Sequence, residues 1–118
     1  MGEGTPALGT SAAHADAEVR QFLDEWLGAI CAHFAPEAVL LFGSRAAGTA
    51  DEWSDIDVVV VSRRFEGLGV FDRFRIFDEV VQPHWHVDVL CLTPEEFERR
   101  REGPNIIAEA VRTGVRIV

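Results

Sequence analysis

Four consecutive valines, residues 58–61, close the segment DIDVVVV that begins at Asp55. Valine is stiff at its first side-chain torsion and suits a strand better than a helix. Successive side chains on a strand point to opposite faces, so a strand that is apolar at every position has to be covered on both faces. This run therefore constrains the fold to a sheet with helices packed on it.

Helical and strand patterns alternate along the chain. After Asp16, apolar residues recur at the spacing of one helix face until Pro36 ends the pattern. Strands are expected over residues 38–42, 55–61, 84–92 and 115–118, with a short helix from Ser44, a polar loop over 62–69 and a last helix over 105–113. A further helix face carries Phe71, Phe74, Phe77 and Val81, and Thr93-Pro94-Glu95-Glu96 has the pattern of a capping box.

The alternation predicts the α/β class, with a small mixed sheet in a single domain. The chain has 118 residues, of which 47% are apolar, enough for one core. Residues 1–15 lack an apolar period and are expected to form a flexible tail, followed by the domain at 16–118. Cys31 and Cys91 form no CxxC pair and are expected to be reduced thiols. No apolar run is long enough for a membrane span, so we expect a cytoplasmic protein.

The net charge of −9 disfavours direct binding of nucleic acid, because phosphate-binding proteins normally present a basic stripe. All basic residues are arginine, and the chain has neither lysine nor tyrosine. The Arg99-Arg100-Arg101 run lies beside glutamates and is expected to form a solvated helix surface with pairs such as Glu95 to Arg99.

Asp55 and Asp57 are two residues apart at the head of the valine strand, so their side chains project to the same face. Two adjacent carboxylates repel each other and raise each other's pKa unless a cation or several donors offset the charge. Mg²⁺, which takes oxygen ligands, would do so. The alternative is that these residues cap the start of the strand and point into water.

Gly43 and Ser44 follow the preceding strand, where glycine allows a ligand to approach the backbone closely and a helix start offers unpaired N–H groups. With the aspartate pair they describe a phosphate cradle beside a metal site. Asp88 lies mid-strand between Val87 and Val89, and as a third carboxylate it could complete a site for two metal ions about 3.5 to 4 Å apart. The alternative for Asp88 is an edge-strand residue that faces solvent.

The motif GSRAAGTADEWSDID resembles the signature of the DNA polymerase β-type nucleotidyltransferase superfamily. Its spacer resembles that of the minimal nucleotidyltransferase (MNT) branch, which includes antitoxins of HEPN-domain ribonuclease toxins. The resemblance implies that Gly43 and Ser44 bind nucleotide phosphates, with Arg45 beside the triphosphate. It also implies that Asp55, Asp57 and Asp88 are the catalytic metal ligands.

Two positions depart from the family pattern. Ala47 stands where many members carry a second arginine, which weakens the expected phosphate binding. Trp53 stands where a proline or polar residue is common. It could stack on a base, anchor a partner or simply pack.

His84 and His86 share the expected strand face of Asp88 and raise the alternative of a zinc site. A structural zinc site needs four ligands, and only Cys31 and Cys91 remain as soft candidates. A partner contact or a surface histidine is the competing interpretation.

The leading hypothesis is a metal-dependent nucleotidyltransferase that moves AMP from ATP to a hydroxyl of a partner protein, with Mg²⁺ or Mn²⁺. The resemblance implies a HEPN toxin as the partner. One rival is a binding module that sequesters its partner without turnover, and another is transfer to a small molecule, for which a homodimer could supply the missing walls. The sequence leaves open the base preference, the acceptor residue and whether the chain forms a homo- or hetero-oligomer.

Overall fold

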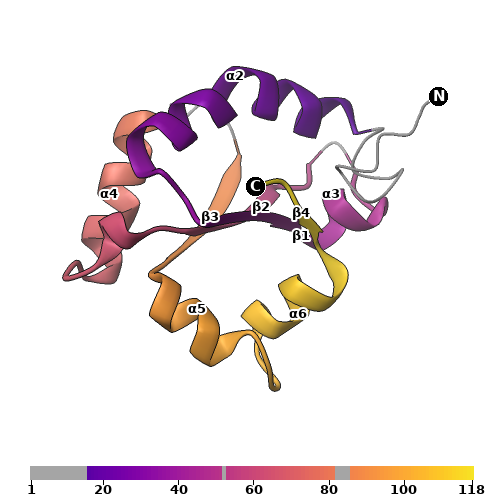
Figure 1. Ribbon diagram of the computed structural model, residues 1–118. Coiled ribbons are helices and arrows are strands. Elements are labelled where there is room, and N and C mark those ends of the chain that lie inside the picture. Colours follow the sequence, from indigo (N-terminus) through magenta and orange to yellow (C-terminus); the bar gives the residue numbers. More distant parts are fainter. Residues whose placement is uncertain (1–15, 52, 82–85) are drawn as a thin grey trace.

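The computed structural model describes residues 16–51, 53–81 and 86–118, and they form a mixed sheet with helices on both faces (Figure 1). In chain order the elements are α2 (Ala17–Phe34), β1 (Ala38–Phe42), α3 (Gly43–Ala47), β2 (Ile56–Val61), the 3₁₀ helix η2 (Arg63–Phe65), α4 (Val70–Val80), β3 (Val87–Leu92), α5 (Pro94–Arg100), α6 (Ile106–Thr113) and β4 (Val115–Arg116). The predicted class, α/β with a small mixed sheet, is confirmed. The predicted tail, residues 1–15, and the expected strand start at residue 84 lie outside the described residues.

The strands lie in the order β3-β2-β1-β4. β2 is parallel to β3, whereas β1 is antiparallel to both β2 and β4. A parallel pair needs a crossover connection, and α4 lies in the connection between β2 and β3. The starts of β2 and β3 therefore lie side by side, with β3 at one edge of the described sheet.

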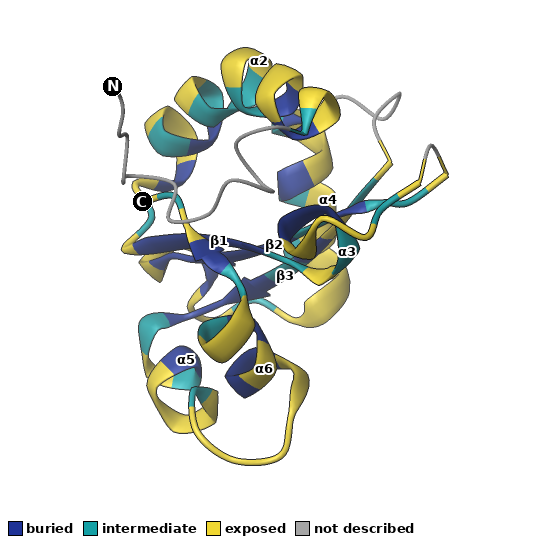
Figure 2. Ribbon diagram, turned by 90° about the vertical axis from the view of Figure 1, so that its right-hand side faces the viewer, coloured by how far each residue is buried: buried dark blue, intermediate teal, exposed yellow. Residues whose placement is uncertain are grey.

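The valine run fills both layers of the core. Val58 and Val60 pack with α2 and α4 on one face of the sheet, whereas Val59 and Val61 pack with α5 and α6 on the other. All four are at most 1% exposed. Figure 2 shows the buried strands between helices whose outer sides are exposed, as a strand covered on both faces requires.

The polar loop predicted over residues 62–69 contains a core residue. Phe65, in η2, is fully buried, and its ring centroid lies 5.3 Å from that of Phe34. Ser62 forms the turn by accepting a hydrogen bond from the Arg64 N–H and donating one to the Phe34 carbonyl. A single phenylalanine among polar residues has no periodicity, so its burial could not be predicted from the local pattern.

The apolar face predicted for α4 is only half buried. Phe77 and Val81 belong to the core, but Phe71 is 86% exposed and Phe74 is 37% exposed. Phe77 packs against Phe34 of α2, with ring centroids 6.0 Å apart. Val70 is also exposed, so the core covers the C-terminal half of α4 and leaves the first turn bare.

The last strand is shorter than predicted. β4 spans Val115 and Arg116, which pair with Leu41 and Leu40 of β1, whereas a strand over residues 115–118 was expected. Past the end of β4, the Ile117 N–H still donates to the Val39 carbonyl of β1. Among the described helices, none combines the length and apolarity that would be needed to cross a membrane.

An ion pair joins α4 to α5. The Arg73 guanidinium donates to both Glu96 carboxylate oxygens at 2.7 and 3.1 Å, and to the carbonyls of Leu68 and Cys91. Glu96 also accepts the Thr93 N–H, which completes the predicted capping box. The hydrogen bonds from Arg73, with help from Thr93, lower the pKa of Glu96 from 4.5 to about 2.

The lowered pKa of Glu96 predicts acid sensitivity. Its stabilising contribution is fully present above about pH 4.5 and is lost as the pH falls toward 2. Glu96→Gln is expected to reduce the free energy of unfolding by about 1 to 3 kcal/mol at pH 7, and by much less at pH 2. Urea unfolding at the two pH values measures this difference. Glu95→Gln, which removes an exposed pair with Arg99, is the control and should change stability by less than about 0.5 kcal/mol.

Candidate active site

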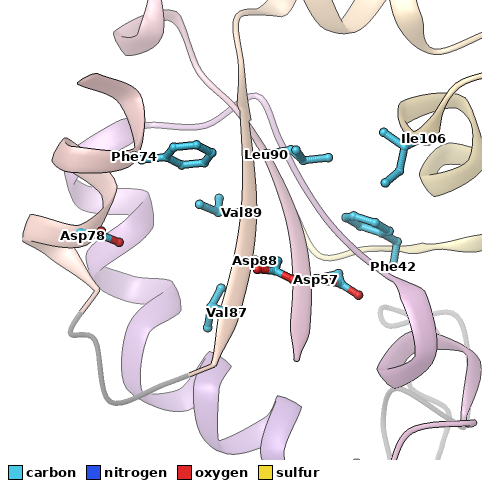
Figure 3. A pocket seen from close by; sticks show the side chains of 9 residues that line it. All are labelled: Phe42, Asp57, Phe74, Asp78, Val87, Asp88, Val89, Leu90 and Ile106. Atoms are coloured by element: carbon cyan, nitrogen blue, oxygen red, sulfur yellow. The ribbon is translucent and has the colours of Figure 1, made fainter. Parts of the chain in front are cut away.

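The register of β2 and β3 places two aspartates side by side. Asp57 is directly opposite Asp88 in the parallel pair, and Asp57 is also opposite Phe42 of β1. Both carboxylates lie on the face that α6 partly covers, near the starts of the two strands (Figure 3). The sequence hypothesis that these residues are neighbours is therefore matched by the strand pairing.

Asp55 lies just before β2 and is half exposed. His86 precedes β3, and its Nδ1 atom is 3.6 Å from Asp55 Oδ1. The backbone joins the same two segments, because the Ile56 N–H donates to the His86 carbonyl. The three aspartates predicted from the sequence therefore lie at one corner of the sheet.

The electrostatics of this corner show unbalanced negative charge. The pKa of Asp57 is raised, first by burial and then by the charges of Asp88 and Asp55. The pKa of Asp88 is raised by burial and by Asp55. Within the described residues, no three His, Cys, Asp or Glu side chains are already arranged around one point as metal ligands. The donor set nevertheless fits a hard divalent cation such as Mg²⁺ or Mn²⁺, which binds carboxylate oxygens and would offset their repulsion.

Gly43 brings the turn after β1 against Asp57. Its φ angle is +76°, in the left-handed region, and a Cβ added there would overlap the Asp57 carboxylate. Ser44 follows it in α3 and is half-buried. The predicted phosphate-binding residues are thus placed directly beside a predicted metal ligand.

Arg45 is buried, and its side chain makes contacts that the sequence hypothesis did not include. Its guanidinium donates to both carboxylate oxygens of Asp16 at 3.2 Å, and to the carbonyls of Asp51 and Ser54. Asp16 is also the N-cap of α2, where it accepts the Val19 N–H. Arg45 therefore fixes the loop before β2, and its role beside a triphosphate stays a prediction.

A cavity of about 560 Å³ opens beside the carboxylates, and its lining is shown in Figure 3. Its apolar residues come from four elements: Phe42, Phe74, Val87, Val89, Leu90 and Ile106. The carboxylates in the lining are Asp57, Asp78 and Asp88. Sequence reasoning missed this cavity, because its residues are brought together only by the sheet order and the crossover.

Cys91, one of the two cysteines considered as ligands of a zinc site, is not placed to bind zinc beside Asp88. Cys91 is buried in the core on the α2 and α4 face, and burial raises the pKa of its thiol to about 12. Asp88 lies at the opposite parity of β3, facing the cavity. His84 lies outside the described residues. Both cysteines are free thiols, as predicted.

A family model described as a nucleotidyltransferase domain matches residues 23–115. The chain belongs to the nucleotidyltransferase domain family. The match includes Gly43, Ser44 and the three aspartates of the site. Among curated proteins there is no significant match.

A solved structure supports the same assignment. It is the 1.40 Å crystal structure of a protein from Sulfolobus solfataricus that is described as a candidate nucleotidyltransferase. The two chains are 27% identical over 90% of this chain and 98% of the other, with a TM-score of 0.53. Nucleotidyltransferase domains generally use a nucleotide substrate and a divalent metal, which agrees with the carboxylate corner and the glycine turn.

The close approach of Gly43 to Asp57 predicts an outcome for alanine at this position. Gly43→Ala is expected to lower both stability and the affinity for ATP with Mg²⁺, the latter by at least about tenfold. Gly67→Ala is the control: its φ angle is +80°, but no atom lies within 4 Å of an added Cβ, so it carries only the backbone strain of about 1 to 2 kcal/mol. Urea unfolding and calorimetric titration measure both effects. Equal behaviour of the two variants would contradict the overlap with Asp57.

The contacts of Arg45 predict that charge alone is insufficient at this position. The planar guanidinium of Arg45 donates from several nitrogen atoms to Asp16, Asp51 and Ser54. The single ammonium nitrogen of a lysine cannot reach all three acceptors. Arg45→Lys is therefore expected to reduce the free energy of unfolding by about 1 to 3 kcal/mol. Arg63→Lys, in an exposed pair with Glu37, should change it by less than about 0.5 kcal/mol. Similar losses from both variants in thermal unfolding would argue against a structural role for Arg45.

Proposed function

We propose that this nucleotidyltransferase domain moves AMP from ATP to a hydroxyl group of a partner protein and releases pyrophosphate. The observation that carries the proposal is the position of Asp57 between two different neighbours. Gly43, the first residue of α3 after β1, lies against it, and Asp88 lies opposite it on β3. A phosphate chain and an acceptor hydroxyl can therefore approach the same carboxylate from two sides.

Each residue has a distinct role in this proposal. Gly43 and Ser44 would hold the phosphates through the backbone of the turn, which lies against the Asp57 carboxylate because Gly43 has no Cβ. Asp55, Asp57 and Asp88 would hold Mg²⁺ or Mn²⁺, which would stabilise charge on the transferring phosphate and lower the pKa of the acceptor hydroxyl. Asp88 is more exposed than Asp57, and in this proposal it orients that hydroxyl.

The transfer needs no reactant other than ATP and the acceptor hydroxyl. The hydroxyl oxygen forms a bond to the α-phosphorus, and the bond from that phosphorus to the α–β bridging oxygen breaks. Pyrophosphate leaves, and the hydroxyl proton passes to the Asp88 carboxylate.

A protein acceptor agrees with the resemblance to MNT antitoxins, which implies a HEPN-domain toxin as the partner. Modification of the toxin would then silence its ribonuclease activity. The chain has no tyrosine, so it cannot be its own acceptor on that residue. Transfer to a small molecule and sequestration without transfer are separate outcomes of the test below.

The test is intact mass spectrometry of proteins captured by this chain from its native host, before and after incubation with ATP and Mg²⁺. We expect a captured partner to gain the mass of one or more AMP groups. Asp57→Asn keeps the size of the side chain but removes its charge, and should reduce the rate at least about a thousandfold. Chelation with EDTA should stop the transfer, and added Mg²⁺ or Mn²⁺ should restore it.

Asp24→Asn is the matched control, because Asp24 is exposed on α2, on the opposite face of the sheet. It should leave the rate unchanged. A partner that is captured and inhibited but never gains mass would favour sequestration. Transfer that Asp57→Asn leaves intact would contradict the assignment of the site.

A further inference from the structure

Large apolar side chains are exposed next to the proposed acceptor side of the site. Phe71 and Phe74 come from α4 and Ile106 from the start of α6, and Ile106 is 56% exposed. Leu90 of β3 lies between them and is half-buried (Figure 3). Exposed apolar groups that gather around a cavity are typical of an interaction surface, whereas scattered ones are not.

Phe74, Leu90 and Ile106 line a groove along β3, whereas Phe71 lies outside its lining. The cavity beside Asp57 and Asp88 shares Phe74 and Leu90 with a second cavity of about 280 Å³. The second cavity extends past Val70 toward Arg73, Glu96 and Arg100. We call the two together the β3 groove, with Phe42, Phe74, Leu90 and Ile106 as its apolar floor near the aspartates.

The charge of the groove specifies what can bind there. In its larger part the described lining residues include three carboxylates, Asp57, Asp78 and Asp88, and no cationic side chain. In its smaller part Arg73 is paired with Glu96 and Arg100 adds a positive charge, so the negative charge of the groove lies at the end near the aspartates. Asp57 and Asp88 are the proposed metal ligands, which leaves Asp78 to attract a charged occupant. An occupant therefore needs apolar groups for the floor and positive charge at the end of the groove near Asp78. A second copy of this chain, with a net charge of −9, and a nucleic acid are both disfavoured by repulsion.

The order of residues across the sheet gives the groove its place in the reaction. Gly43 lies against Asp57, Asp57 is opposite Asp88 on the edge strand β3, and Phe74 of α4 lines the cavity beside these carboxylates. If Gly43 marks the phosphate side, the groove lies on the other side of the carboxylates, where the acceptor enters. The geometry points to the β3 groove as the docking site for a segment of the acceptor protein that carries apolar side chains flanked by lysine or arginine, next to the modified hydroxyl. This inference rests on the proposed function in taking the acceptor to be a protein.

The test uses synthetic decapeptides labelled with fluorescein. In the first pool a central Ser, Thr or Tyr is flanked by leucines and then by lysines. A second pool replaces the lysines by glutamates, and a third replaces the leucines by alanines. Binding is measured by fluorescence anisotropy without nucleotide. The first pool is expected to bind at least about tenfold more tightly than either of the others, and its advantage over the second should shrink at high salt.

Two variants assign the binding to the groove. Phe74→Ser removes part of the apolar floor, and Asp78→Arg reverses one charge of the rim. Each should weaken binding of the first pool by at least about fivefold. Asp24→Arg on α2 makes the same charge change outside the groove and should have no comparable effect. Equal binding of the three pools, or unchanged binding by Phe74→Ser and Asp78→Arg with the fold intact by circular dichroism, would overturn the inference.

The readouts separate this inference from the proposed function. Binding that depends on the groove, with no AMP transfer to any peptide or captured protein, would support docking and contradict the transferase proposal. AMP transfer to a captured partner that is unaffected by Phe74→Ser and Asp78→Arg would support the transferase and overturn the docking site. Sedimentation provides a third readout. A dimer that Phe74→Ser dissociates would assign the groove to a second copy and overturn the inference as well.

Discussion

The burial of β2 on both faces is the constraint on which the rest of the structure depends. Its valines divide between the α2/α4 layer and the α5/α6 layer, so the strand cannot shift by one residue without turning every side chain to the other face. The same parity fixes Asp57 toward the cavity, opposite Asp88. A strand that is buried on both faces thus carries, next to its start, a carboxylate that has to be held accurately. The apolar core and the site are consequences of one register.

The negative charge at the strand starts is balanced neither by a described cation nor by hydrogen bonds strong enough to lower the pKa values. Burial and mutual repulsion instead raise the pKa of both Asp57 and Asp88. Stability comes from elsewhere in the fold, through contacts such as those of Arg73 with Glu96 and Arg45 with Asp16. This division is typical of a site arranged for a bound cation, because the carboxylates that would bind it are held together at a cost to the apo protein.

Features that depend on short-range pattern could be predicted from the sequence. The valine strand, the capping box at Thr93 and the Gly43-Ser44 turn before the aspartates each carry their signal within a few residues. Features that depend on distant partners could not. Asp16 and Arg45 are 29 residues apart, and no local pattern pairs them. Likewise, the exposure of Phe71 follows from where the core ends on α4, which helical periodicity cannot reveal.

The position of Asp88 on the edge strand has a consequence for solubility. β3 has the sequence VDVLCL, and it is the last strand on its side of the described sheet. Unpaired strand edges with apolar sequences are templates for aggregation, and a charged side chain on the edge is a common protection. Asp88 is the one charged residue of that strand, and it is exposed. The residue proposed to orient the acceptor hydroxyl is therefore also the charged side chain by which an edge strand of this kind resists pairing with other chains. A related domain that had lost catalysis and kept only binding would therefore still benefit from an acidic residue at position 88.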